Sequence, residues 1–299
     1  MDEIKYISRL DPGFPEKLKN IPLPPAGIYY TGELPAEDEK SVAIVGSRNC
    51  SQYGREIAEY FASYLAKQGV QVISGLARGI DGISQRAAAS AGGKTFGVLG
   101  TGIDVVYPRE NRAIFEQVKA SGGLISEYPP GTTPLKPYFA ERNRLISGLA
   151  DLLLVIEAKV MSGTSITVRC ALEQGRDVYA VPGRLTDPLS AGCNRLIAQG
   201  AGTALSPEDV ILALKDGSER PRITPGFEPA GEVPPGDEKK MTLDGMEKIV
   251  YSTLDLYPKT LGEIAREGKI PLGEAMEALI SLTIRGFAGE CGKNNYVRM

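Results

Sequence analysis

The chain has 299 residues, of which 42% are hydrophobic and 24% charged, and this size and composition suit a globular protein with one large and one small domain. No apolar stretch reaches the roughly 20 residues of a membrane helix, and the N-terminus lacks a signal-peptide pattern, so we expect a cytoplasmic protein without a membrane partner. Histidine is absent, which removes the commonest general base and the commonest metal ligand. The four cysteines form no CxxC pair, so neither a zinc site nor disulfides are expected.

The net charge of −3 is unevenly distributed. Residues 41–205 contain 17 Lys and Arg against 13 Asp and Glu, whereas the rest of the chain is acidic. A mildly basic central region can bind a polyanion through a local patch even when the whole protein is acidic. The charge pattern therefore keeps nucleic acid among the candidate ligands.

Residues 1–40 are rich in proline, and we expect them to form an extended segment that packs on the following domain. Within this segment only residues 26–32, AGIYYTG, have the pattern of a strand. The segment is too poor in apolar periodicity to form a core of its own.

Residues 41–214 alternate between apolar runs typical of strands and amphipathic helical patterns. Gly69 stands where a helix should end, and Asp81 where a helix N-cap is expected. This alternation predicts an α/β domain with a doubly wound, mostly parallel, Rossmann-like sheet covered by helices on both faces. Strands are expected at 41–47, 70–75, 94–100, 124–129, 151–158 and 177–183, and helices at 54–69, 82–93, 109–123, 140–150, 165–175 and 194–201.

Residues 215–241 are polar and contain five prolines, a composition typical of a linker. Residues 242–299 show the pattern of three helices and a terminal hairpin, with Thr260 capping the second helix and Pro271 in the first turn of the third. This order predicts a small C-terminal winged-helix domain. Its seven Lys and Arg against eight Asp and Glu disfavour a duplex-binding transcription factor, so we expect an interaction module.

The loop Gly46-Ser47-Arg48 follows the first strand of the α/β domain and precedes a helix. In one interpretation the N–H groups of the helix start and the Arg48 guanidinium bind a phosphate. In the other, Gly46 only permits a tight turn and Arg48 is solvated, and this loop alone favours neither. A dinucleotide site is not expected, because the fingerprint needs three glycines where this loop has one.

Glycine-bearing loops recur at 74–81, 100–111, 162–164 and 182–184, each after a predicted strand. Carboxyl ends of parallel strands share one edge of a sheet, so Gly163 and Thr164 are expected at the same edge as Gly46. Five such loops make a broad surface lined by backbone, which is more than a single mononucleotide needs.

Basic and aromatic residues alternate within residues 136–148, KPYFAERNRLISG. This alternation suits a single-stranded polynucleotide, because cations bind phosphates while rings stack on bases. In the alternative interpretation, Phe139 belongs to the core and the arginines lie on a helix surface; we favour binding, because Asn143 brings a further polar group to the same strand ends. The candidate contacts in this part of the chain are Arg109, Lys136, Phe139, Arg142, Asn143 and Arg144.

Catalytic chemistry finds little support. Four acidic residues near strand ends, Asp81, Asp104, Glu127 and Glu157, have a spacing that matches no metal motif. The hydroxyls of loop 162–164 have no histidine and no nearby lysine with which to form a triad. We therefore expect no catalytic residues, no metal and no cofactor.

Eight stretches resemble, in order, the motifs of the DNA-processing protein A family, also called DprA or Smf. They span about 165 residues: GSR, SGLARGID, GTGIDVVYP, RNRLISGL, LVIEA, SGTSIT, VYAVPG and GCNRLIAQGA. The N-terminal FPEKLKNIPLPPAGIYYTGEL also resembles the segment that precedes this domain in the family.

The resemblance implies an extended Rossmann-like fold that binds single-stranded DNA, forms a homodimer and loads RecA recombinase on incoming DNA during natural transformation, without catalysis. It also implies that residues 46–48 form a phosphate-binding loop, that Arg109 and Lys136 are basic contacts and that Phe139 contacts a base. Many members carry a C-terminal winged helix, as this chain is expected to do.

The chain departs from the family pattern at two places. Gln85 stands where members often have a histidine after GID, and YFA at 138–140 stands where they often have HFP. These changes leave a binding function intact and disfavour a histidine-dependent reaction. The alternative function is a nucleotide-processing enzyme related to phosphoribohydrolases, but the loop MSGTSITV lacks the acid–base glutamate of that class.

Overall fold

The computed structural model describes residues 3–216, 244–254, 259–290 and 295–298. The chain divides between residues 229 and 230 into two compact units. In the described ranges, no helix combines the length and the apolar character needed to cross a membrane.

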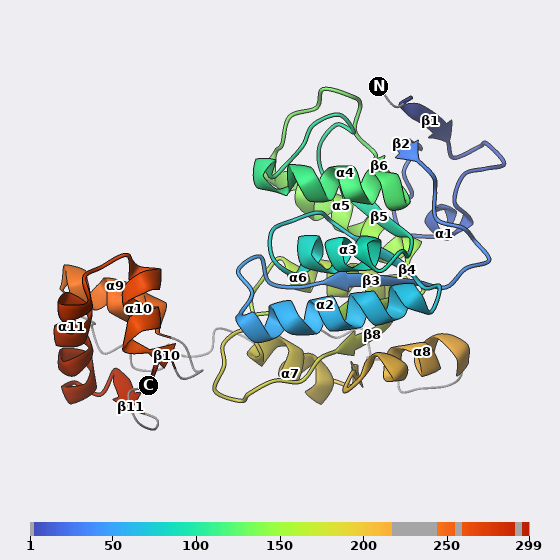
Figure 1. The fold of residues 1–299 in the computed structure, drawn as a ribbon. Coiled ribbons are helices and arrows are strands. Elements are labelled where there is room, and N and C mark those ends of the chain that lie inside the picture. The colour runs from blue at the N-terminus through green and yellow to red at the C-terminus, as the bar shows by residue number, and fades with distance from the viewer. Residues whose placement is uncertain (1–2, 217–243, 255–258, 291–294, 299) are drawn as a thin grey trace. The chain divides into compact units, whose positions relative to one another are not determined.

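The first unit is built on a nine-stranded sheet with the order β1-β2-β6-β5-β4-β3-β7-β8-β9 (Figure 1). All neighbouring strands from β6 to β9 pair in parallel, while β1–β2 and β2–β6 are antiparallel. The prediction of a mostly parallel, doubly wound sheet is therefore confirmed. The strands are β1 (Lys5–Ser8), β2 (Gly27–Gly32), β3 (Ser41–Val45), β4 (Gln71–Ser74), β5 (Thr95–Leu99), β6 (Gly123–Ser126), β7 (Leu152–Val155), β8 (Asp177–Ala180) and β9 (Gly202–Thr203).

Helices cover both faces of this sheet (Figure 1). One face carries α1 (Glu16–Lys19), α5 (Lys136–Leu149), α6 (Thr164–Glu173) and α7 (Ala191–Ala198). The other carries α2 (Gln52–Lys67), α3 (Ile80–Ser90), α4 (Arg112–Ser121) and α8 (Pro207–Asp216), with a short 3-10 turn (Arg109–Asn111) before α4.

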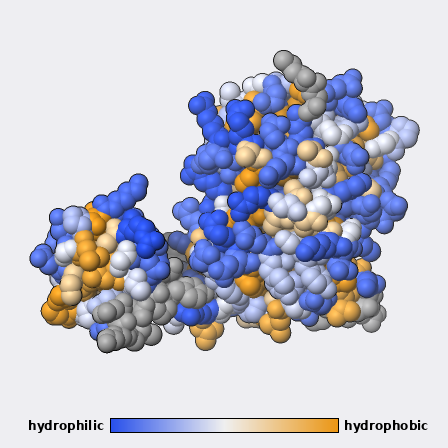
Figure 2. Space-filling view, viewed as in Figure 1, coloured by the Kyte–Doolittle hydropathy of each residue, from blue (hydrophilic) through white to orange (hydrophobic). Residues whose placement is uncertain are grey.

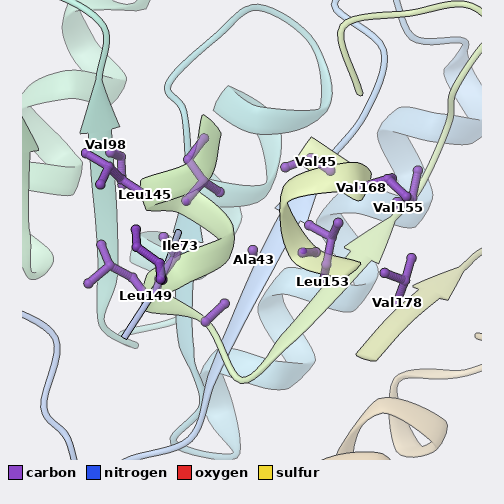
Figure 3. Packing of buried hydrophobic residues seen from close by; sticks show 14 of the residues in the cluster. Ala43, Val45, Ile73, Val98, Leu145, Leu149, Leu153, Val155, Val168 and Val178 are labelled. Carbon is purple, nitrogen blue, oxygen red and sulfur yellow. The ribbon is translucent and has the colours of Figure 1, made fainter. Parts of the chain in front are cut away.

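Side-chain alternation along the strands explains the two layers. In β3, Ala43 and Val45 face the cluster beneath α5 and α6, whereas Val42 and Ile44 face the cluster beneath α2 and α3. Because successive strand residues point to opposite faces, an unbroken apolar run fills both layers. Figure 3 shows the first layer, in which Leu145 and Leu149 of α5 and Val168 of α6 pack on the sheet.

The N-terminal segment contains more structure than the sequence indicates. Besides β2 it forms β1 and the short helix α1, and both strands extend the main sheet. Phe14, Leu18, Ile21 and Ile28 are buried in the same cluster as the strands of the α/β domain. At the other end, α8 continues to Asp216 and buries Val210. The predicted boundary at 214 therefore falls within its last turn.

The second unit consists of α9 (Gly245–Thr253), α10 (Leu261–Gly268) and α11 (Leu272–Ile284) with a small antiparallel sheet ordered β10-β12-β11. Its strands are β10 (Lys259–Thr260), β11 (Ala288–Glu290) and β12 (Asn295–Arg298). As expected, Thr260 caps α10, in a capping box with Glu263. The winged-helix assignment stays a prediction, and part of the predicted hairpin, residues 291–294, lies outside the described residues.

This second unit has its own core, centred on Val250, Ile264, Leu279 and Leu282. Helix α11 also exposes an apolar row, and hydrophobic surface on this unit is visible in Figure 2. The row follows the four-residue spacing of one helix face and consists of Leu272, Met276, Ile280 and Ile284.

Candidate nucleic-acid interface

Backbone hydrogen bonds to two neighbouring segments fix the loop after β3. The Ser47 N–H donates to the Glu157 carbonyl after β7 (2.7 Å), and the Ser47 carbonyl accepts from the Ile80 N–H at the start of α3 (3.2 Å). A Cβ on Gly46 or Gly79 would overlap these neighbouring segments, so only glycine permits so close an approach. The Arg48 side chain therefore extends from a rigid loop, and it is exposed.

The start of α2 is not the open phosphate seat that one interpretation of the sequence required. The buried Glu157 carboxylate lies there, accepting from the Ser51 N–H (2.9 Å) and from the Ser51 hydroxyl. Ser51 in turn caps the helix by accepting from the Gly54 N–H (3.0 Å). A carboxylate at a helix N-terminus occupies the place that favours an anion, and it repels a second one. At this loop Arg48 alone is left as a candidate phosphate contact.

Asp81 does not cap α3, contrary to the sequence expectation. The N-cap is Gly79, and Asp81 lies in the first helical turn, buried, with its carboxylate accepting from the Gly75 N–H (3.2 Å). Burial raises the pKa of Asp81, while nearby Arg142 and Arg48 act against that rise. Gly75 and Asp81 thus belong to the support beneath the loops.

Arg142 is a support residue as well, and the expectation of a surface phosphate contact is wrong for it. Its side chain is 3% exposed and donates to the carbonyl of Gly75 (2.9 Å) and to that of Val98. Burial lowers the pKa of Arg142 to about 10, and the Asp81 charge opposes this shift. By joining the ends of β4 and β5, Arg142 holds two loops of the interface in register.

Arg144 also has partners within the protein. Its guanidinium forms two hydrogen bonds of 2.8 Å with the Glu127 carboxylate and another of 2.9 Å with the Leu23 carbonyl. A cation paired in this way binds a phosphate less strongly, because phosphate binding would have to break the ion pair with Glu127. The neighbouring Asn143 accepts a 3.3 Å hydrogen bond from Arg142 and is half-buried.

Phe139 lies in the first turn of helix α5, which begins at Lys136, four residues earlier than predicted. Its ring covers Gly100, where a Cβ would collide with it, and lies 5.3 Å from the ring of Tyr107 at a 36° tilt. Tyr107 is 47% exposed and was missed by the sequence analysis. Its position next to a candidate arginine, in a glycine-bearing loop, is the signal that could have identified it.

The loops after β5 and β6 are joined in the same close manner. The Gly102 N–H donates to the Thr132 carbonyl (2.9 Å), and the Gly131 N–H donates to the Asp104 carboxylate (2.7 Å). The Ser126 hydroxyl donates to the Thr101 carbonyl (2.6 Å). These hydrogen bonds hold in place the loops next to the rings of Tyr107 and Phe139.

Exposed cations complete the surface. Among the described residues, none forms an ion pair with the guanidinium of Arg48, that of Arg109 or the Lys136 ammonium, and all three side chains are exposed. Arg78, by contrast, is paired with Glu110. The structure thus separates the predicted basic residues into three available cations and two that stabilise the fold.

Gly163 and Thr164 begin α6 at the same edge of the sheet, after β7. Gln85 replaces the expected histidine with an equivalent hydrogen-bonding group, since its amide accepts from the Leu76 N–H and donates to the Phe96 carbonyl, both at 3.0 Å. No group of three or more potential metal ligands exists in the described part of the chain.

Comparison with known proteins agrees with the family resemblance of the sequence motifs. Residues 5–215 match the family described as DNA recombination-mediator protein A. The DNA processing protein DprA of Streptococcus pneumoniae is 43% identical over 208 residues, which cover 70% of this chain and 73% of that protein. The DprA of Bacillus subtilis is 41% identical over 204 residues, covering 68% and 69% of the two chains.

Two solved structures share the fold. The crystal structure of Streptococcus pneumoniae DprA superposes with a TM-score of 0.68 at 40% identity, covering 71% of this chain and 75% of that one. Helicobacter pylori DprA, whose structure is described as revealing its single-stranded DNA binding mode, gives 0.65 at 28% identity and covers 73% and 100%. The chain belongs to the DNA recombination-mediator protein A family.

Proposed function

We propose that this protein binds single-stranded DNA along the carboxyl edge of its sheet. One observation carries the proposal. Exposed cations without ion-pair partners and the partly exposed rings of Tyr107 and Phe139 lie on loops that backbone hydrogen bonds hold in place. Cations track phosphates, and aromatic faces stack on bases that a duplex would keep paired.

The contacts divide between three parts of the chain. Arg48 would bind a phosphate from the loop after β3, while Arg109 and Lys136 would bind phosphates from the loop after β5 and the start of α5. Phe139 and Tyr107 would receive one base. Arg142 joins the end of β4 to β5 and so supports the loops beside these contacts.

The proposal extends to a recombination mediator that protects incoming DNA and loads RecA recombinase, acts as a homodimer and performs no catalysis. Its support is the family match together with the single-stranded DNA binding described for the Helicobacter pylori relative.

The test is a comparison of one oligonucleotide as a single strand and as a duplex, by mobility shift or fluorescence anisotropy, over a range of salt concentrations. We expect the single strand to bind more tightly. Each phosphate contact contributes about −0.7 to the slope of log K against log salt, so three contacts predict a slope of about −2. Equal affinity for the two forms, or a flat salt response, contradicts the proposal.

A further inference from the structure

A small pocket lies beside the start of α6, where the loop after β7 approaches α7. It is lined by Lys159, Ser162, Thr164, Ser165 and Arg195, and by apolar residues at its base. Gly192 brings α7 against the loop, since its N–H donates to the Ala158 carbonyl (2.8 Å) and a Cβ there would overlap that carbonyl.

Polar groups in this pocket lack partners within the protein. The Thr164 side chain is 7% exposed, yet no described residue forms a hydrogen bond with its hydroxyl. The buried Ser162 hydroxyl is likewise unpartnered in the structure. Helix α6 begins at Thr164 without a side-chain cap, and in its first turn the N–H groups of Ser165 and Ile166 donate to the carbonyls of Ser162 (3.1 Å) and Gly163 (3.2 Å). A buried hydroxyl without a partner is costly, which indicates a ligand that supplies one.

The charge of the pocket is positive. Within the described ranges, neither the Lys159 ammonium nor the Arg195 guanidinium has an ion-pair partner. The closest acidic groups along the chain are engaged elsewhere: Glu157 accepts from Ser51, and Asp187 accepts from the Leu189 N–H (2.9 Å). Two cations therefore line the pocket without an anion from the protein.

We propose that this pocket binds a phosphate monoester, the phosphate at the end of a bound DNA strand. A monoester carries a charge of about −1.5 to −2 and three acceptor oxygens, which match two cations and the hydroxyls of Ser162 and Thr164. An internal phosphodiester carries one charge and leaves fewer oxygens for this donor set. The assignment to DNA rests on the proposed function, whereas the phosphate chemistry rests on the pocket alone.

The experiment measures the affinity of the full chain for one oligonucleotide sequence in four forms. These carry a 5′-phosphate, a 3′-phosphate, hydroxyls at both ends, or a 5′-phosphate blocked as its methyl ester. The dye is attached to the opposite end in each case. We expect one terminal phosphate to increase the affinity about tenfold or more, since one charge-assisted hydrogen bond is worth that much, and the methyl ester to lose most of the gain. The end that is preferred fixes the polarity of the strand.

Two variants connect the effect to the pocket. Thr164→Val keeps the shape and removes the hydroxyl, and Arg195→Gln removes the charge; in both, the ratio of affinities for phosphorylated and unphosphorylated ends should fall toward one. Arg169→Gln, an exposed position later on α6, is the matched control and should keep the ratio. A ratio of one in the unaltered protein overturns the proposal, as does a high ratio that both variants retain.

Inorganic phosphate separates failure of the pocket from failure of DNA binding. We expect the phosphorus NMR signal of phosphate to broaden with the unaltered protein and to broaden less with Thr164→Val. If no oligonucleotide binds but this difference is present, the proposed function fails and the phosphate pocket stands. If phosphate shows no difference and the oligonucleotides bind regardless of their ends, the pocket proposal fails and the proposed function stands.

Discussion

Arg48 is an exposed cation without an ion-pair partner among the described residues, and its removal should weaken DNA binding without disturbing the fold. The side chain is exposed on a loop fixed through Ser47, so Arg48→Ala leaves no cavity. A charge-assisted bond to phosphate is worth roughly 1.5–3 kcal/mol, which predicts a tenfold to hundredfold loss of affinity. The matched control is Lys67→Ala, an equal charge change on an exposed residue at the far end of α2. Normal binding by Arg48→Ala would show that the loop is only a turn.

Phe139 and Lys136 should respond differently to substitution, because one offers a ring and the other a charge. Phe139→Leu should weaken single-strand binding by about 1–3 kcal/mol and leave the salt slope unchanged. Lys136→Ala should make the slope shallower by about 0.7, the contribution of one phosphate. Anisotropy titrations at several salt concentrations measure both quantities.

Stability measurements provide the control for Phe139, whose ring packs on Gly100 and Tyr107. If the leucine variant melts at a lower temperature yet binds normally when folded, the ring is only a packing element. The interface would then be an electrostatic groove without a stacking platform.

At the scale of single residues, the sequence predicts which residue types gather at the sheet edge but not which of them are already engaged. Arg48 and Arg142 are the same residue type in the sequence, yet Arg48 is exposed, whereas Arg142 donates to the carbonyls of Gly75 and Val98. Those acceptors are 67 and 44 residues away along the chain. Periodicity within one helix cannot report such distant partners, and the same is true of the pair between Arg144 and Glu127.

At the scale of elements, Asp151 ties the N-terminal segment to the sheet. Its carboxylate accepts from the Lys17 ammonium of α1 (2.8 Å), the Ser41 N–H (2.8 Å) and the Ser41 hydroxyl (3.0 Å). Burial alone would raise the pKa of Asp151, but these hydrogen bonds outweigh it and lower the pKa. Because the folded pKa lies below the unfolded one, this stabilisation is present above about pH 4 and is lost as the pH falls through the folded pKa.

Asp151→Asn should therefore destabilise the protein at pH 7 by about 2 kcal/mol, the scale of hydrogen bonds to a charged group, and by less near pH 3. Urea unfolding of both proteins at the two pH values measures this, and urea is preferred because it does not screen charge. The control is Asp177→Asn, which alters an exposed carboxylate at the start of β8. An equal loss of stability at both pH values would show that the charge of Asp151 is unimportant.

The sequence predicts well the elements that have a clear apolar pattern. These are the unbroken apolar runs of β3 and β7 and the helical spacing of apolar residues in α2. The misses are short or lie next to proline: β1 and α1 have four residues each, and α5 begins one residue before Pro137. Prolines at 129, 130 and 134 made the whole stretch resemble a loop. Yet proline is favoured in the first turn of a helix, and this preference could have placed the start of α5 correctly.

At the scale of the whole molecule, the interface and the second unit have different surfaces. The predicted phosphate contacts, including Arg195 in the pocket beside α6, all lie before residue 206, on the basic part of the chain. Helix α11 instead exposes Leu272, Met276, Ile280 and Ile284, with the acidic Glu274 and Glu277 exposed on the same helix. An apolar row with carboxylates beside it is unfavourable to a phosphate backbone, which disfavours α11 as a reader of duplex DNA.

A chain that ends after residue 220 should consequently fold and bind single-stranded DNA with the affinity of the full chain. It retains α8, whose Val210 and Leu214 are buried against the first unit, whereas a chain ending at Leu214 would lose the last turn of that helix. The second unit has a core of its own, and the clusters that hold the sheet consist only of residues of the first unit. Circular dichroism checks the fold, and anisotropy with one oligonucleotide compares the two chains at equal salt. If the shortened chain is folded but no longer binds, the second unit is itself a primary DNA-binding element, and the division of roles between the two units is wrong.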